Sequence, residues 1–186
     1  MVTQQPQPTT VGTERLVQQA QAGDRAACEA LYREFVRTVH GIALSIGGRD
    51  VADDVTQEVF LQAFVKLGEL RDPAAFPGWL CTAARRAAID RHRAAARRSP
   101  AELPELAGRE PSPADSYAVK SAADRALACL LQLPEAYRET LTLRLVEGLS
   151  GPEIAARTGM THGSVRVNLT RGMALLRPLL TEAGLP

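Results

Sequence analysis

Apolar residues recur every three to four positions through most of the chain, and no segment alternates between apolar and polar residues as a half-buried strand would. In the N-terminal half, Thr13 can cap a short helix. Asp24 can cap a long helix, which Gly47 and Gly48 would end. The apolar positions of the long helix are Ala27, Cys28, Leu31, Tyr32, Phe35, Val36, Val39, Ile42, Ala43 and Ile46.

The same periodicity predicts a helix over 50–67 and another that runs from Pro73 or Pro77 into an arginine-rich segment. In the C-terminal half it predicts helices over 119–132, 134–147, 151–158 and 161–180. Aromatic residues make up 4% of the chain, so the core must be built from Ala, Leu, Val and Ile, as in small helical bundles. The sequence therefore predicts an all-α protein.

Charge and proline divide the chain into parts. Residues 82–98 hold six arginines against Asp90, a net charge of +5, whereas residues 99–118 carry a net charge of −3 and four prolines. Because proline lacks the backbone donor and clashes inside a helix, we predict a flexible, extended linker over 99–118. The expected organisation is a tail and short helix over 1–23, a helical domain over 24–98, the linker over 99–118, and a second helical domain over 119–186.

The helix predicted over 50–67 has one face that packing within its own domain would leave exposed. One side would bury Ala52, Val55, Val59, Phe60, Ala63 and Leu67. The opposite side carries Asp54, Glu58, Leu61 and Val65 at helical spacing, with Gln57 beside them. A stripe of acidic and aliphatic residues is typical of a helix that docks on a partner helix; a merely solvated face is the alternative.

The arginine-rich helix is a candidate for contact with DNA. Its inner face would hold Phe76, Leu80, Ala83, Ala84 and Ala87. Its outer face would hold Arg85, Arg86, His92 and Arg93, with Arg97 and Arg98 at its end. Every positive charge here is arginine, whose planar fork pairs with phosphate through two hydrogen bonds. This choice favours nucleic-acid binding over a solvated basic face.

Residues 149–176 have the pattern of a helix-turn-helix. Ser150 is the expected cap of a short helix, Gly159 would end it, and Thr161 would begin the next helix. The second helix would bury Val165, Leu169, Met173 and Leu176 and expose Gly163, Ser164, Val167, Thr170 and Arg171, flanked by Arg166 and Asn168. Small, polar and cationic side chains fit a major groove; a purely structural helical hairpin is the alternative.

Other residues that could carry chemistry indicate no catalytic or metal site. Cys28, Cys81 and Cys129 are odd in number and widely spaced, which favours buried free thiols. The three histidines are scattered, and the sequence has neither a nucleophile–base pattern nor a phosphate-binding glycine-rich loop. It also lacks a signal-peptide pattern in the first dozen residues and an apolar run long enough to span a membrane. We expect a cytoplasmic, non-enzymatic protein without cofactor, metal, small-molecule substrate or membrane insertion.

Three segments resemble bacterial sigma factors. DVADDVTQEVFL, at 50–61, is similar to the region 2 helix that binds core polymerase, and AFPGWLCTAARRAAIDRHR, at 75–93, resembles the region 2 promoter helix. Residues 133–177 resemble region 4. Because regions 2 and 4 are joined by a short linker with no region 3 domain, the chain is similar to the extracytoplasmic-function (ECF) group.

The resemblance implies three sets of contacts. The clamp helices of the polymerase β′ subunit would bind Asp54, Gln57, Glu58, Leu61 and Val65. The minus-10 element would contact Phe76, Trp79, Arg85, Arg86, Arg93 and Arg97, beside the loop 71–78. The minus-35 element would contact Ser164, Arg166, Val167, Thr170 and Arg171. The β flap and an anti-sigma factor are implied as further partners.

The chain differs from the common family pattern at three positions. It has Arg86 where the family often has Asn, Val167 where Ser is usual, and Asn168 where Arg is usual. These differences imply unusual promoter sequences.

The resulting expectation is an alternative sigma factor that binds RNA polymerase core and directs promoter recognition and transcription initiation. Two alternatives stay open. One is a helix-turn-helix regulator that binds duplex DNA without core polymerase, for which an acidic docking helix would be unnecessary. The other is a sigma-like module that only sequesters an anti-sigma protein.

Overall fold

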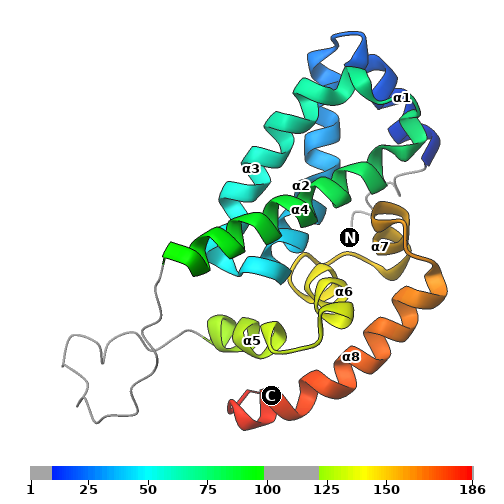
Figure 1. Cartoon of the computed structure of the whole chain (residues 1–186). Coiled ribbons are helices and arrows are strands. Elements are labelled where there is room, and N and C mark those ends of the chain that lie inside the picture. Colours follow the sequence, from blue (N-terminus) through cyan, green and yellow to red (C-terminus); the bar gives the residue numbers. More distant parts are fainter. Residues whose placement is uncertain (1–9, 99–121, 186) are drawn as a thin grey trace.

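The computed structural model describes residues 10–98 and 122–185, and every regular element in these ranges is helical (Figure 1). The all-α prediction is confirmed. The N-terminal unit consists of α1 (Thr10–Gln21), α2 (Arg25–Gly47), α3 (Arg49–Lys66), two short 3₁₀ turns, η1 (Leu67–Glu69) and η2 (Pro73–Ala75), and α4 (Phe76–Arg98). The C-terminal unit consists of α5 (Ala122–Leu131), α6 (Glu135–Leu145), α7 (Gly151–Thr158) and α8 (His162–Glu182). The predicted linker, 99–118, lies outside the described residues.

Most helix boundaries follow local capping chemistry. The Asp24 carboxylate accepts hydrogen bonds from the backbone N–H groups of Ala26 and Ala27, and Gly48, with φ of 72°, allows the sharp turn into α3. The predicted cap at Thr13 is wrong, because α1 already begins at Thr10. Thr13 lies inside that helix, and its hydroxyl donates to the Glu34 carboxylate of α2 at 2.8 Å.

The core of the N-terminal unit is one cluster of side chains from α1 to α4. Phe35 of α2 and Phe76 of α4 meet edge to face at its centre, with ring centroids 5.4 Å apart. All the residues predicted to be buried over 50–67 are buried, five of them on α3 and Leu67 in η1. On α4 the core-facing stripe is Phe76, Leu80, Cys81, Ala84 and Ala88, so the predicted inner residues Ala83 and Ala87 lie at its edge, only half-buried.

Helix capping and one close contact fix the helix-turn-helix in the C-terminal unit. Ser150 and Glu153 form a reciprocal capping box at the start of α7, and Gly159, with φ of 76°, ends the helix. The Thr161 hydroxyl then caps α8. Further along α8, Gly172 lets this helix approach α6, since a Cβ there would lie 2.7 Å from the Leu141 Cδ1 atom.

The two units pack directly on each other, a contact that the sequence analysis did not predict. In Figure 1, α6 lies against α2, and α7 lies beside α4. Gly41 of α2 makes the first contact possible, because a Cβ at this position would lie 2.8 Å from both Leu143 Cδ2 and Glu147 Cγ. The C-terminal unit therefore sits on the N-terminal unit rather than merely following it along the chain.

His40 of α2 is a titratable group at this junction. Its Nδ1 lies 2.6 Å from Glu147 Oε1, and its Nε2 lies 3.5 Å from Asp53 Oδ1 of α3. The cations nearby are Arg49, and Arg37, which lies 3.9 Å from the other oxygen of Glu147. The hydrogen bond to Glu147 and the attraction of both carboxylates outweigh burial and raise the pKa of His40 above 6.5.

This raised pKa predicts a pH-dependent stability. The stabilisation by protonated His40 is complete below pH 6.5, its unfolded-state pKa, and is lost as the pH rises through the higher folded-state pKa. We expect the free energy of unfolding to fall across that window and His40→Gln to flatten the dependence, as measured by urea unfolding at pH values from about 5.5 to about 8.5. His162→Gln, at an exposed position on α8, should keep the wild-type slope. A His40→Gln slope equal to that of the wild type would contradict the assignment.

Candidate polymerase and nucleic-acid interfaces

The α3 surface, defined as Asp54, Gln57, Glu58, Leu61 and Val65, lies on the side of α3 away from the core. Leu61 is 71% exposed and Val65 is 84% exposed, although both are large aliphatic residues. The side chains of Asp54 and Glu58 are 66% and 43% exposed. The structure therefore brings the predicted core-binding residues together on one accessible helix face that combines apolar area with negative charge.

Arg91 of α4 contacts this surface, and the sequence analysis did not identify it. Its guanidinium lies 3.6 Å from the Asp54 carboxylate and 3.1 Å from that of Glu58. Helical periodicity shows which face of α4 is outward, but it carries no signal for a pair of residues 33 positions apart on two crossing helices. The two acids are thus held at the edge of the α3 surface beside α4.

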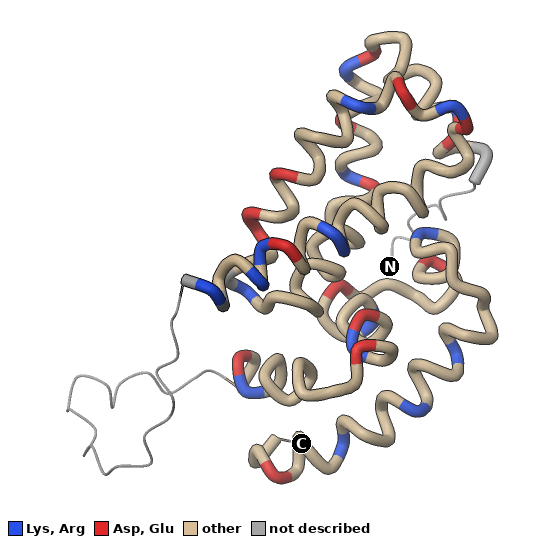
Figure 2. Tube along the Cα trace, in the orientation of Figure 1, with Lys and Arg blue, Asp and Glu red and all other residues tan. Residues whose placement is uncertain are grey.

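The predicted minus-10 residues on α4 differ in accessibility. Arg86, Arg93 and Arg97 are exposed, and Figure 2 shows positive charge concentrated toward the end of α4. Trp79 is half-buried, whereas the side chain of Phe76 is fully buried in the core. In this conformation Phe76 positions the start of α4 instead of offering its ring to DNA.

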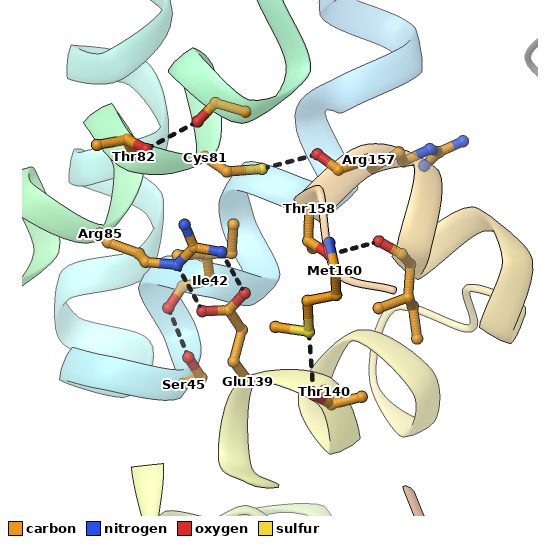
Figure 3. Close-up of polar contacts among 12 residues, drawn as sticks. Ile42, Ser45, Cys81, Thr82, Arg85, Glu139, Thr140, Arg157, Thr158 and Met160 are labelled. Atoms are coloured by element: carbon orange, nitrogen blue, oxygen red, sulfur yellow. Dashed lines mark hydrogen bonds and ion pairs between the residues drawn. The ribbon is translucent and has the colours of Figure 1, made fainter. Parts of the chain in front are cut away.

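Arg85 is the predicted minus-10 residue with an intramolecular partner. Its Nε and Nη2 groups donate to the two carboxylate oxygens of Glu139 on α6, both at 2.8 Å (Figure 3). The Arg85 side chain is 32% exposed and the Glu139 side chain 12% exposed. The hydrogen bonds from Arg85 raise the pKa of its guanidinium. This fork-on-carboxylate geometry is the one that arginine also uses to bind phosphate.

A cleft of about 710 Å³ lies between α4 and α7. Trp79, Arg85 and Arg86 line one side and Arg157 and Thr158 the other. Below it, the Cys81 thiol donates to the Arg157 carbonyl at 3.1 Å, and burial raises the pKa of this thiol to about 12 (Figure 3). Nucleophilic chemistry needs the thiolate form of a cysteine. Because Cys81 stays protonated, we assign it a packing role.

The α8 surface is defined as Ser164, Arg166, Val167, Thr170 and Arg171. All five residues are exposed, and Val167 is 42% exposed despite being apolar. Asn168, which the sequence analysis placed beside this surface, is half-buried and donates from its amide to the Thr140 hydroxyl of α6 at 3.2 Å. Asn168 thus fixes α8 on α6 in the described structure.

The described parts of the chain contain neither a cluster of metal ligands nor a membrane-spanning helix. Within 10–98 and 122–185, no three His, Cys, Asp or Glu side chains are grouped as metal ligands. The helices of these ranges also include none that is long and apolar enough to cross a membrane. Cys28, Cys81 and Cys129 are free thiols, the last two buried and Cys28 partly buried.

Comparison with known proteins assigns both units. The family model for Sigma-70 region 2 matches residues 31–98, and the model for Sigma-70, region 4 matches residues 123–176. Together they cover about two thirds of the chain. The fold and its surfaces thus define a two-part sigma-type transcription factor.

Individual relatives narrow this class. The chain is 36% identical over 191 residues to the ECF RNA polymerase sigma factor SigD of Mycobacterium tuberculosis. This match covers 94% of this chain and 88% of SigD. It is 34% identical over 169 residues to the probable RNA polymerase sigma factor RfaY of Xanthomonas campestris pv. campestris. This second match covers 84% of this chain but 42% of RfaY. The chain belongs to the ECF RNA polymerase sigma factor family.

A solved structure shows the same fold. CnrH, solved in complex with the cytosolic domain of CnrY, is 26% identical to this chain with a TM-score of 0.60. The match covers 91% of this chain and 97% of CnrH. The similarity extends over both helical units.

Proposed function

We propose that this chain is an alternative sigma factor that binds RNA polymerase core and directs promoter recognition and transcription initiation. The observation that carries the proposal is the presence of two separate surfaces suited to different partners. The α3 surface offers aliphatic and acidic groups to a protein, and the α8 surface offers small, polar and cationic groups to a major groove. The matches to both sigma regions support this division of labour.

Each predicted contact has a place in this proposal. The α3 surface docks on the clamp helices of the β′ subunit. Arg85, Arg86, Arg93 and Arg97 of α4, with Trp79, engage the minus-10 element, and Phe76 supports them from the core. The α8 surface reads the minus-35 element while the C-terminal unit contacts the β flap. The chain acts in the cytoplasm without catalytic chemistry, cofactor or small-molecule substrate of its own.

An anti-sigma factor is a further proposed partner. The structure of CnrH contains the cytosolic domain of CnrY, and a structure of RpoE from Bartonella quintana contains the anti-sigma factor NepR. The similarity to CnrH over nearly the whole chain supports an equivalent partner here.

Run-off transcription tests the function directly. Purified core polymerase with this chain, on a library of genomic fragments, should give transcripts that core alone does not give. A gel-shift assay with and without core polymerase distinguishes a sigma factor from a regulator that binds duplex DNA unaided. If no promoter-specific transcripts form but an anti-sigma protein still binds, the sequestering module is favoured instead.

Charge reversal on the α3 surface should weaken core binding. We expect Asp54→Lys combined with Glu58→Lys to cost about 2–5 kcal/mol of association free energy, because unfavourable charges replace complementary ones at the interface. Titration of fluorescent core enzyme measures this loss, and circular dichroism should show unchanged helix content.

Two variants control for the contacts of those acids within the chain. Arg91→Gln removes the ion pairs to Asp54 and Glu58 but leaves both carboxylates in place, so core affinity should persist. Glu29→Lys reverses an exposed acid on α2 that is not part of the α3 surface, and should bind like the wild type. Equal core affinity for the double-lysine variant and the wild type would refute the assignment.

Val167 should select a thymine in the minus-35 element. An exposed apolar side chain gains little in water, but against a thymine C5-methyl group in the major groove it buries area. We expect Val167→Ser to cost about 1 kcal/mol at the preferred promoter, the scale of one buried methylene, and to relax the choice of that base. Arg171→Ala should cost more and, if it contacts phosphate, should reduce the salt dependence.

Uracil substitution removes only the methyl group and isolates this contact. Each minus-35 thymine is replaced in turn, and open-complex formation is measured for the wild type and Val167→Ser. One position should be sensitive in the wild type and insensitive in the variant. If that position stays equally sensitive in both proteins, the methyl contact does not exist.

A further inference from the structure

The cleft of about 710 Å³ between α4 and α7 combines apolar walls with positive charge. Arg85 and Arg86 of α4 line it together with Arg157 of α7. The acid of the lining is Glu34 of α2, so three positive charges face one negative charge, a net charge of +2. Small-molecule sites have volumes of about 300–1,000 Å³ and mostly apolar walls with a few polar groups. The size and the lining of this cleft therefore fit a small organic anion.

Arg157 is a buried cation whose charge is incompletely compensated. The carboxylate of Glu153 lies 3.6 Å from its guanidinium, and the Thr38 hydroxyl lies 3.5 Å from its Nη1. Within the described residues, the Arg157 Nε has no hydrogen-bond acceptor. Burial lowers the pKa of this guanidinium below its ordinary value, although nearby carboxylates oppose the shift. An anion in the cleft would supply the missing negative charge.

The α4 wall offers further guanidinium groups to an anion. Arg86 is exposed, and among the described residues no carboxylate forms an ion pair with it. Arg85 donates from Nε and Nη2 to Glu139, which leaves its Nη1 outside that pair. Because a guanidinium binds phosphate oxygens through several N–H groups, these side chains can hold more than one phosphate.

Trp79 adds an aromatic group to the same wall. It lines the cleft, is half-buried, and its ring centroid lies 6.0 Å from that of Phe76. Nucleobases stack on aromatic side chains of this kind. A fatty acid would bring one carboxylate and an aliphatic chain, whereas a nucleotide brings several negative charges and a planar ring. The lining therefore matches a nucleotide better than a lipid.

We propose that the cleft between α4 and α7 binds a free nucleoside polyphosphate, with its phosphates on Arg86 and Arg157 and its base on Trp79. This binding does not depend on the proposed function. A promoter strand carries the same phosphates and bases and could reach the α4 wall alone. Arg157 separates the two sources, because it belongs to the α7 wall and is absent from the predicted promoter contacts of α4.

Fluorescence of the full chain tests the site directly, because Trp79 is its only tryptophan. Titration with ATP or GTP should quench this fluorescence in a saturable way. Adenosine and inorganic triphosphate each lack half of the proposed contacts. Each should therefore bind at least about tenfold more weakly than ATP, as measured by calorimetry.

Arginine variants locate the phosphate site. Arg86→Gln, which changes an exposed side chain, and Arg157→Gln should each raise the half-saturating ATP concentration about tenfold, since each removes charged hydrogen-bond donors. Arg15→Gln removes the same charge from an exposed position on α1 outside the cleft and should leave that concentration unchanged. Trp79→Leu should weaken ATP binding more than triphosphate binding in calorimetry.

Three results would overturn the inference. The first is the absence of saturable quenching by ATP and GTP up to about 1 mM, the weak end of ordinary binding. The second is an equal loss of ATP affinity in Arg15→Gln and Arg86→Gln, which would indicate unspecific attraction of anions. The third is quenching by a single-stranded oligonucleotide that ATP does not reproduce and that Arg157→Gln leaves intact, since the cleft would then serve promoter DNA. Run-off transcription plays no part in these measurements, so its failure would refute the proposed function and leave this site standing.

Discussion

The arrangement of this molecule depends on the close packing of α6 against α2. Gly41 supplies the space, Leu143 and Glu147 fill it, and the Arg85–Glu139 pair adds a directional contact beside it. Because α8 packs on α6 through Gly172 and Asn168, the position of α6 also sets where the α8 surface lies relative to α4. One helix thus links the packing inside the C-terminal unit to the position of the Arg85 side chain on α4.

The α8 surface and the arginines of α4 have different relations to the fold. The α8 surface projects from a helix whose other face is buried, and all its members are available without rearrangement. The α4 arginines lie on a long helix that also contacts the core, the acids of the α3 surface and Glu139 of α6. In Figure 2 the positive charge at the end of α4 and that along α8 lie on different sides of the molecule.

Local features made much of the fold predictable. The buried stripe of α3, the cap at Asp24, the start of α7 at Ser150 and its end at Gly159 all follow from short-range periodicity and capping. The exposed α3 and α8 surfaces follow from the same helical wheels. Thr13 was misplaced because a capping residue can equally satisfy its hydroxyl on a neighbouring helix, as it does on Glu34.

Contacts between distant segments could not be predicted in the same way. The pairs Arg91–Glu58 and Arg85–Glu139 join residues 33 and 54 positions apart, and their partners are set by how helices cross. Gly41, inside a long helix, was the available signal that another element approaches closely there, since glycine in a helix interior costs about 1 kcal/mol. Helical spacing indicated that the arginines of α4 face outward, but not that Arg85 is paired with Glu139.

The most direct measurement of this packing is the distance between the two units in the free chain. Fluorophores attached through unnatural amino acids at Thr82 of α4 and Ala136 of α6, both exposed and each within one turn of Arg85 or Glu139, report on this contact. The packing of α6 against α2 predicts efficient energy transfer in the free chain. Low transfer in the free chain would contradict this packing.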